Sequence, residues 1–180
     1  MSQTSDTLTI AVMNTKGGTT KTTTTMLLAH ALNTAGRTVE VWDADPQGSA
    51  SEWIEDAEEA RGEPLPIRWD AVNRSTLTRK TSNADVLLID TAPGDPASQT
   101  AAVARADLVI VPSGAARLDL ARVWATVDAV GQAVPSVVLL TCLMISLWSR
   151  DKRDLGSLDL AQGLGKAWSR CCLSVHLLAT

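Results

Sequence analysis

Phenylalanine and tyrosine are both absent from this sequence of 180 residues, and tryptophan supplies its six large aromatic side chains. The three cysteines, Cys142, Cys171 and Cys172, form no CxxC pair and have no metal-ligand spacing with either histidine. Neither a disulfide framework nor a zinc site is therefore indicated, and we expect ordinary reduced thiols.

Long apolar runs and an excess of positive charge are also missing. No apolar run approaches the roughly 18 residues of a membrane span, and the opening MSQTSDT lacks the basic and apolar regions of a signal peptide. We therefore expect a cytoplasmic protein with no membrane partner. The net charge of −4 argues against a chain that is basic throughout and coats nucleic acid by bulk electrostatics, but leaves a local basic face open.

The remaining composition is that of a globular protein, with 45% hydrophobic and 20% charged residues. This balance sets aside disorder, collagen and coiled coil. The length predicts a single domain over residues 1–180.

Short apolar runs alternate with stretches of helical pattern along the chain. The pattern predicts strands at 8–13, 38–42, 64–69, 85–89, 107–111 and 136–141, and helices at 21–36, 49–60, 96–106 and 120–130. This alternation predicts a three-layer, doubly wound α/β fold with a mostly parallel sheet. Because ligands bind such sheets beyond the carboxyl ends of the strands, the polar residues there are the candidates for chemistry: Asn14 to Thr22, Asp43, Asp45 and Asp90.

The loop after the first predicted strand, Lys16 to Thr22 (KGGTTKT), carries the strongest chemical signal. A phosphate group needs converging backbone N–H donors, small residues, a cation and a hydroxyl for its metal ion. The loop supplies each of these, and Lys21 opens a helix whose positive dipole end faces the anion. The literal GxxxxGK[ST] pattern fails, because Thr15 and Thr20 stand where its two glycines would be.

Three segments together resemble the ParA/MinD family of ATPases, which has a deviant phosphate loop, and most of all its small ParA-type partition ATPases. NTKGGTTKTTTTMLLAHAL is similar to the family's KGGxxK[ST] loop and helix, DADPQGS at 43–49 to its DxDPQG motif, and LLIDTAPG at 87–94 to its strand ending in aspartate. The order and spacing of the three motifs make the match specific, and the resemblance spans about residues 8–141. It implies a P-loop NTPase fold.

The resemblance implies how the loop would bind ATP. Lys21 would bind the β- and γ-phosphates, and Thr23 would contact the α-phosphate. Lys16, the family's signature lysine, would reach across a nucleotide-sandwich homodimer to the partner's phosphates. The implied nucleotide-binding residues are Lys16, Gly17, Gly18, Thr19, Thr20, Lys21, Thr22 and Thr23.

The resemblance also implies a metal site and a reaction. Thr22 would ligate Mg²⁺, with Asp43 and Asp90 supporting the metal shell. Asp45 would orient the attacking water and, with Lys16 and Lys21, form the catalytic set for hydrolysis of ATP to ADP and phosphate. Taken singly, the three aspartates have a structural alternative as turn residues, and Asp43 and Asp45 also as helix caps.

Two features depart from the family pattern. Thr20 replaces a glycine, and if that position needs a positive φ, a β-branched residue there costs on the order of 1–2 kcal/mol and puts turnover in question. Residues 142–180 match no family segment and shift in composition to a net charge of +2. Two hypotheses cover this tail, a divergent truncated end or a reading-frame error, and resequencing distinguishes them.

The leading functional hypothesis is a ParA-like ATPase that segregates plasmid or chromosomal DNA. Its implied partners are a second copy of itself with ATP, non-specific DNA and a ParB-type centromere-binding adaptor. The basic candidates for a DNA face are Arg117, Arg122, Arg150, Lys152 and Arg153.

Two alternatives stay open: a MinD-like positioning ATPase, and a hydrolysis-deficient nucleotide-binding or interaction module. SRCCLSVHLLAT makes a poor amphipathic anchor for the first. An iron-protein-type reductase is disfavoured because residues 1–141 contain no cysteine, and a dehydrogenase because no GxGxxG follows the first strand.

Overall fold

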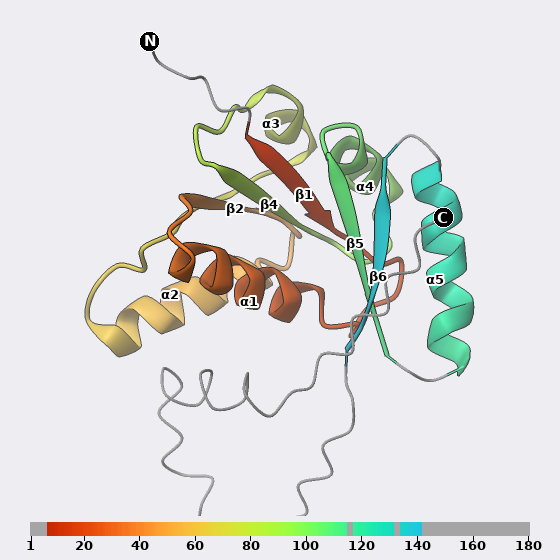
Figure 1. The fold of residues 1–180 in the computed structure, drawn as a ribbon, viewed down its shortest axis with the longest axis horizontal. Helices are drawn as coiled ribbons and strands as arrows, with labels where there is room; N and C mark the ends of the chain where they lie inside the picture. Colours follow the sequence, from red (N-terminus) through yellow and green to blue (C-terminus); the bar gives the residue numbers. More distant parts are fainter. Residues whose placement is uncertain (1–6, 115–116, 132–133, 142–180) are drawn as a thin grey trace, which may run out of the picture.

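The computed structural model describes residues 7–114, 117–131 and 134–141 (Figure 1). The strands are β1 (Leu8–Val12), β2 (Val39–Ala44), β3 (Arg68–Ala71), β4 (Val86–Thr91), β5 (Leu108–Ser113) and β6 (Ser136–Leu140). The helices are α1 (Lys21–Thr34), α2 (Ser49–Arg61), α3 (Arg74–Arg79), α4 (Pro96–Val103) and α5 (Arg117–Val130). The predicted tail 142–180, with Arg150, Lys152 and Arg153, lies outside the described residues, as do the side chains of Arg117 and Arg122.

The six strands form one sheet in the order β3-β2-β4-β1-β5-β6, and every neighbouring pair is parallel. Helices α1 and α2 cover one face, and α3, α4 and α5 cover the other (Figure 1). The predicted three-layer, doubly wound fold is therefore confirmed. Parallel strands need crossover connections, and the helices that supply them bury both faces of the sheet.

Burial on both faces explains the composition of the central strands. Every residue of β2 and β4 is buried, and β4 accordingly reads as a nearly continuous apolar run, VLLIDT. Leu88 and Val41 belong to the cluster that packs under α1, whereas Leu87 and Trp42 belong to the cluster under α3, α4 and α5. The protein thus has one hydrophobic cluster on each face of the sheet.

The structure differs from the prediction mainly at the strand β3 and the helix α3. The strand expected at 64–69 is β3, which begins only at Arg68 and is mostly exposed at the sheet edge. Helix α3 was not predicted. Asn73 begins it with a capping box, accepting hydrogen bonds from the amides of Ser75 and Thr76 while the Thr76 side chain accepts one from the Asn73 amide.

No helix within the described ranges has both the length and the apolar character needed to cross a bilayer.

We predict that Leu88→Ala lowers the free energy of unfolding by about 2–5 kcal/mol, because Leu88 is fully buried in a central strand and its loss leaves a cavity. Leu8→Ala is the matched control, since Leu8 is 44% exposed on the neighbouring strand and should cost less than about 1 kcal/mol. Chemical denaturation measures both. Equal losses in the two variants would contradict the assignment of Leu88 to the core.

Candidate functional site

The carboxyl ends of β1, β2 and β4 bring the sequence-predicted aspartates together. The strand register pairs Asp90 at the end of β4 with Val12 on one side and with Asp43 on the other. The loop after β1 leads directly into α1, which begins at Lys21. The candidate residues of all three motifs therefore lie at one edge of the sheet.

The loop between β1 and α1 is fastened to the neighbouring elements. The buried Asn14 side chain donates a hydrogen bond to the Pro112 carbonyl of β5 at 2.8 Å and accepts one from the Lys16 amide at 2.9 Å. The Thr15 hydroxyl lies 3.3 Å from the Thr126 hydroxyl of α5. Asn14 was predicted only as part of a candidate segment, and its use as an anchor was not foreseen, because its partner is 98 positions away.

Lys21 lies against the loop that precedes it. Its ammonium group donates a hydrogen bond to the Lys16 carbonyl at 3.2 Å, and the side chain is buried. Burial lowers the pKa of Lys21, while the negative charges of Asp90 and Asp45 act in the opposite direction. A buried ammonium group beside loop carbonyls and a helix N-terminus is well placed to accept an anion.

Thr20 adopts the left-handed conformation, with φ 62° and ψ 26°. It is the single residue other than glycine with a positive φ in the described part of the chain. Position 20 therefore has the positive φ that makes a residue with a Cβ unfavourable there, by about 1–2 kcal/mol. Its hydroxyl hydrogen-bonds the Thr141 hydroxyl at 2.7 Å and the Thr19 carbonyl at 2.6 Å.

Asp90 is buried at the end of β4 and receives two hydroxyl groups from α1. The Thr22 hydroxyl donates to it at 2.7 Å and the Thr25 hydroxyl at 3.2 Å. Burial raises the pKa of Asp90 from its usual 3.8 to about 6, and nearby Asp43 adds to this, while the two hydroxyl hydrogen bonds and Lys21 oppose it. Sequence reasoning missed Thr25, although its spacing of three from Thr22 puts both on one helix face.

Asp43 and Asp45 organise the start of α2. One Asp43 oxygen accepts hydrogen bonds from the amide and hydroxyl of Ser51, at 2.8 and 2.7 Å, and the other accepts from the Asp45 amide at 3.0 Å. Asp45 in turn accepts from the Gln47 amide at 2.9 Å. Asp43 therefore binds an amide in the first turn of α2 and Asp45 serves as a turn residue, whereas the N-cap position of α2 is Gly48. The roles of both aspartates toward metal and water stay predictions.

The donors around Asp90 suit a hard divalent cation. Thr22 and Asp90 offer oxygen atoms, and Mg²⁺ is typically held by one or two protein oxygens together with phosphates and water. Among the described residues, no group of three or more His, Cys, Asp or Glu side chains could hold a metal ion by itself. This donor set fits a metal that arrives with its nucleotide rather than one held in a complete protein cage.

A sequence profile described as the CobQ/CobB/MinD/ParA nucleotide binding domain matches residues 10–155. The chain belongs to this MinD/ParA family. Maintenance of carboxysome distribution protein A from Gloeobacter kilaueensis is 39% identical over 155 residues, which are 85% of this chain and 68% of that protein. The protein of the same name from Halothiobacillus neapolitanus is 30% identical over 127 residues, 68% of this chain and 56% of that protein.

Solved structures of the MinD/ParA family share the fold. Apo McdA from Cyanthece matches with a TM-score of 0.59 and 18% identity over 74% of this chain and 72% of that one. The pNOB8 ParA bound to nonspecific DNA matches at 0.54 and 17%, over 74% of this chain and 68% of that one. Cobyrinic acid a,c-diamide synthase from Mycobacterium smegmatis, with a bound ATP analog and magnesium, matches at 0.54 and 22%, over 73% and 72%.

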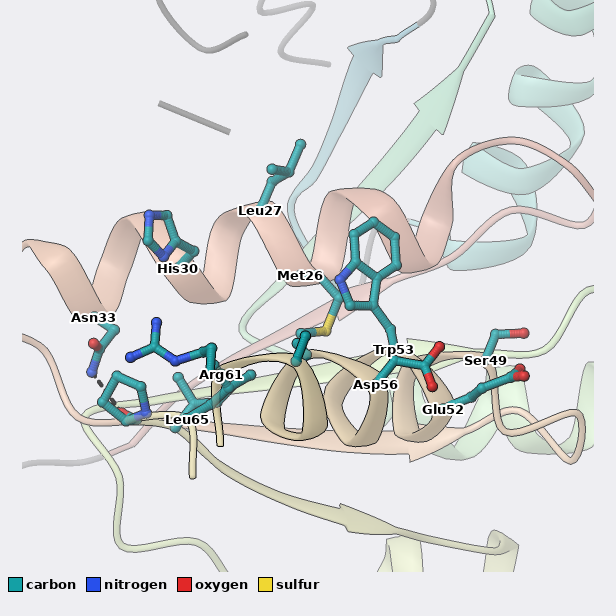
Figure 2. Close-up of a pocket in the computed structure, with 14 residues that line it drawn as sticks. Met26, Leu27, His30, Asn33, Ser49, Glu52, Trp53, Asp56, Arg61 and Leu65 are labelled. Atoms are coloured by element: carbon teal, nitrogen blue, oxygen red, sulfur yellow. Dashed lines mark hydrogen bonds between the residues drawn. The ribbon is translucent and has the colours of Figure 1, made fainter. Parts of the chain in front are cut away.

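A separate apolar groove of about 670 Å³ lies between α1 and α2. Figure 2 shows the Trp53 indole rising from α2 toward α1, over the groove that Met26 and Leu27 also line. The groove contains no residue of the loop between β1 and α1, and Ser49 at the end of the second motif lies at its border.

We predict that the contribution of Asp90 to the free energy of unfolding falls as the pH rises from about 4 to about 6, because folding raises the pKa of Asp90 and the native state then binds its proton more tightly than the unfolded chain does. Asp90 alone accounts for up to about 3 kcal/mol across this window. Denaturation at several pH values measures the fall, and Asp90→Asn should remove it.

Asp56→Asn is the matched control, because Asp56 is an exposed carboxylate on α2. Its pH profile should follow that of the unaltered protein. An Asp90→Asn protein whose stability changes with pH as much as the unaltered protein's would contradict the raised pKa.

Proposed function

We propose that the chain is a ParA-type ATPase, a Mg²⁺- and ATP-dependent dimer switch that binds non-specific DNA and positions a cargo in the cytoplasm. The observation that carries the proposal is the meeting of Lys21, Thr22 and Asp90 at the start of α1, next to the two-lysine loop. We propose further that residues 1–180 act as a single P-loop domain without a membrane partner.

Nucleotide binding would use the loop and the first turn of α1. Lys21 would move from the Lys16 carbonyl to the β- and γ-phosphates, and the amides of Gly17 to Thr20 would surround them. Thr22 would turn its hydroxyl from Asp90 to Mg²⁺, and Thr23 would contact the α-phosphate. The bound Mg²⁺ supplies charge neutralisation on the phosphates. A fold shared with the synthase solved with an ATP analog and magnesium supports this assignment.

Hydrolysis would depend on Asp45, supported by Asp43 and Asp90 around the metal. Asp45 is half-buried near Lys21, and its negative charge opposes the fall in the Lys21 pKa. A carboxylate in this position can orient an attacking water. The strained Thr20 favours a second candidate, a hydrolysis-deficient module that binds nucleotide and switches without turning it over.

The proposed switch is a homodimer formed on ATP, with Lys16 reaching the partner's phosphates. The neighbour named as ParA bound to nonspecific DNA supports DNA as the track. The relatives' names favour a carboxysome-like body as cargo over the plasmid or chromosome that the sequence first suggested. A ParB-type adaptor would then be replaced by a protein that links the cargo to the ATPase.

We predict that two variants separate binding from turnover. Lys21→Ala should weaken Mg-ATP binding roughly tenfold or more, because it removes the charge-assisted contacts to the phosphates. Asp45→Ala should bind Mg-ATP with unchanged affinity and release phosphate at least roughly tenfold more slowly, because it loses the group that orients water. Calorimetric titration and steady-state phosphate release measure the two effects.

Arg79→Ala on α3 is the matched control, since it removes an exposed cation away from the loop. Absence of heat with millimolar Mg-ATP in the unaltered protein would contradict nucleotide binding. Binding without phosphate release, with and without DNA, would support the hydrolysis-deficient candidate instead.

We also predict that a slowly hydrolysed ATP analogue makes the protein sediment as a dimer, whereas ADP leaves it monomeric. Lys16→Ala should bind the analogue and stay monomeric, because the charge that crosses the interface is gone. The dimer should be retained on non-specific DNA and released by salt, as expected for phosphate contacts. DNA retention that does not depend on nucleotide would contradict the switch.

A further inference from the structure

The strained residue of the phosphate loop contacts the end of the sheet's last described strand. The Thr20 hydroxyl donates a hydrogen bond to the Thr141 hydroxyl at 2.7 Å, although the two residues are 121 positions apart. Thr141 directly follows β6, and its amide and hydroxyl both donate to the Ser113 carbonyl of β5, at 2.7 and 3.3 Å. A short chain of hydroxyl groups thus connects the loop to two strands.

We propose that Thr141 is a positioning residue for the phosphate loop: its hydroxyl holds Thr20 in the left-handed conformation from which Lys21 and the first amides of α1 face the nucleotide. The proposal rests on the proposed nucleotide binding. It adds a residue outside the three motifs and gives β6 a part in shaping the site.

The first argument is conformational strain. A β-branched residue with φ 62° persists only where its surroundings hold it, because its Cβ crowds the neighbouring backbone. A glycine in the same place would need no such support. Among the described residues, the Thr20 hydroxyl has two hydrogen-bond partners, the carbonyl of its neighbour Thr19 and the hydroxyl of Thr141. Thr141 is the partner that belongs to a distant part of the chain.

The second argument concerns where the Thr20 hydroxyl is used. Thr20 is the N-cap residue of α1, and a threonine there ordinarily accepts a hydrogen bond from an amide of the first helical turn. Within the described residues its side chain makes no such bond and turns to Thr141 instead. The first-turn amides are thereby left to an anionic ligand, as a phosphate-binding helix start requires.

The third argument is that strand β5 also holds the part of the loop near β1. Asn14 hydrogen-bonds the Pro112 carbonyl, next to the Ser113 carbonyl that anchors Thr141. Asn14 near the start of the loop is therefore held by β5 directly, and Thr20 at its end is held by the adjacent peptide group of β5 through Thr141.

A double-mutant cycle tests the proposal, using the full chain as Thr141→Val, Thr20→Gly and both together. Thr141→Val keeps the side-chain shape and removes the hydroxyl, so it should weaken Mg-ATP binding about fivefold by calorimetry when Thr20 is present. In the Thr20→Gly background the same change should alter affinity by less than about twofold, because glycine needs no support. Thr141→Ser should restore the affinity of the unaltered protein.

Thr100→Val is the matched control, since Thr100 is an exposed residue of α4 whose hydroxyl donates to the Pro96 carbonyl within the same helix. Equal effects of Thr141→Val in both backgrounds, or no effect in either, would overturn the proposal. If Thr141→Val does not fold, Thr141→Ala takes its place in the cycle.

The free energy of unfolding without nucleotide, measured on the same four proteins, separates this proposal from the proposed function. In this unfolding cycle, the coupling between Thr20 and Thr141 should correspond to about a fivefold change in the unfolding equilibrium constant. If the unaltered protein does not bind Mg-ATP, the proposed function fails and the unfolding cycle alone decides whether Thr141 supports Thr20. Additive unfolding energies would then overturn the positioning role as well.

Discussion

One buried carboxylate, that of Asp90, connects the sheet to helix α1 in the candidate site. Asp90 is the last residue but one of β4, a strand that is buried along its whole length, and the hydroxyls of Thr22 and Thr25 bind it from α1. These contacts set the helix start, and with it Lys21, against the carboxyl edge of the sheet. Because burial raises the Asp90 pKa, this attachment also depends on pH.

The sequence predicted the sheet and the motifs well, because their signals are local. A nearly continuous apolar run such as β4 is typical of a strand that is covered on both faces, and a loop of glycine, lysine and threonine between a strand and a helix is typical of phosphate binding. The partly exposed strand β3 and the six-residue helix α3 carried weaker signals. A short capped turn that buries one leucine, Leu77, has too little periodicity to be found.

Contacts between distant parts of the chain were beyond sequence reasoning. Asn14 on Pro112 and Thr20 on Thr141 join segments about a hundred positions apart, and nothing in the local pattern at either end announces the other. Asp43 shows the opposite case, in which a recognised motif residue also has a structural use. Its oxygens accept hydrogen bonds from the Asp45 amide and from Ser51 in the first turn of α2, so this motif residue also fixes the start of α2.

The hydroxyl bridge between Thr20 and Thr141 has a consequence for how such a chain diverges. Positions 20 and 141 become coupled although they are far apart in the gene, because a threonine at position 20 is tolerated while position 141 keeps its hydroxyl. In a relative with glycine at position 20, position 141 would be free to vary. A threonine at position 20 should therefore occur together with a hydroxyl side chain at position 141 across relatives.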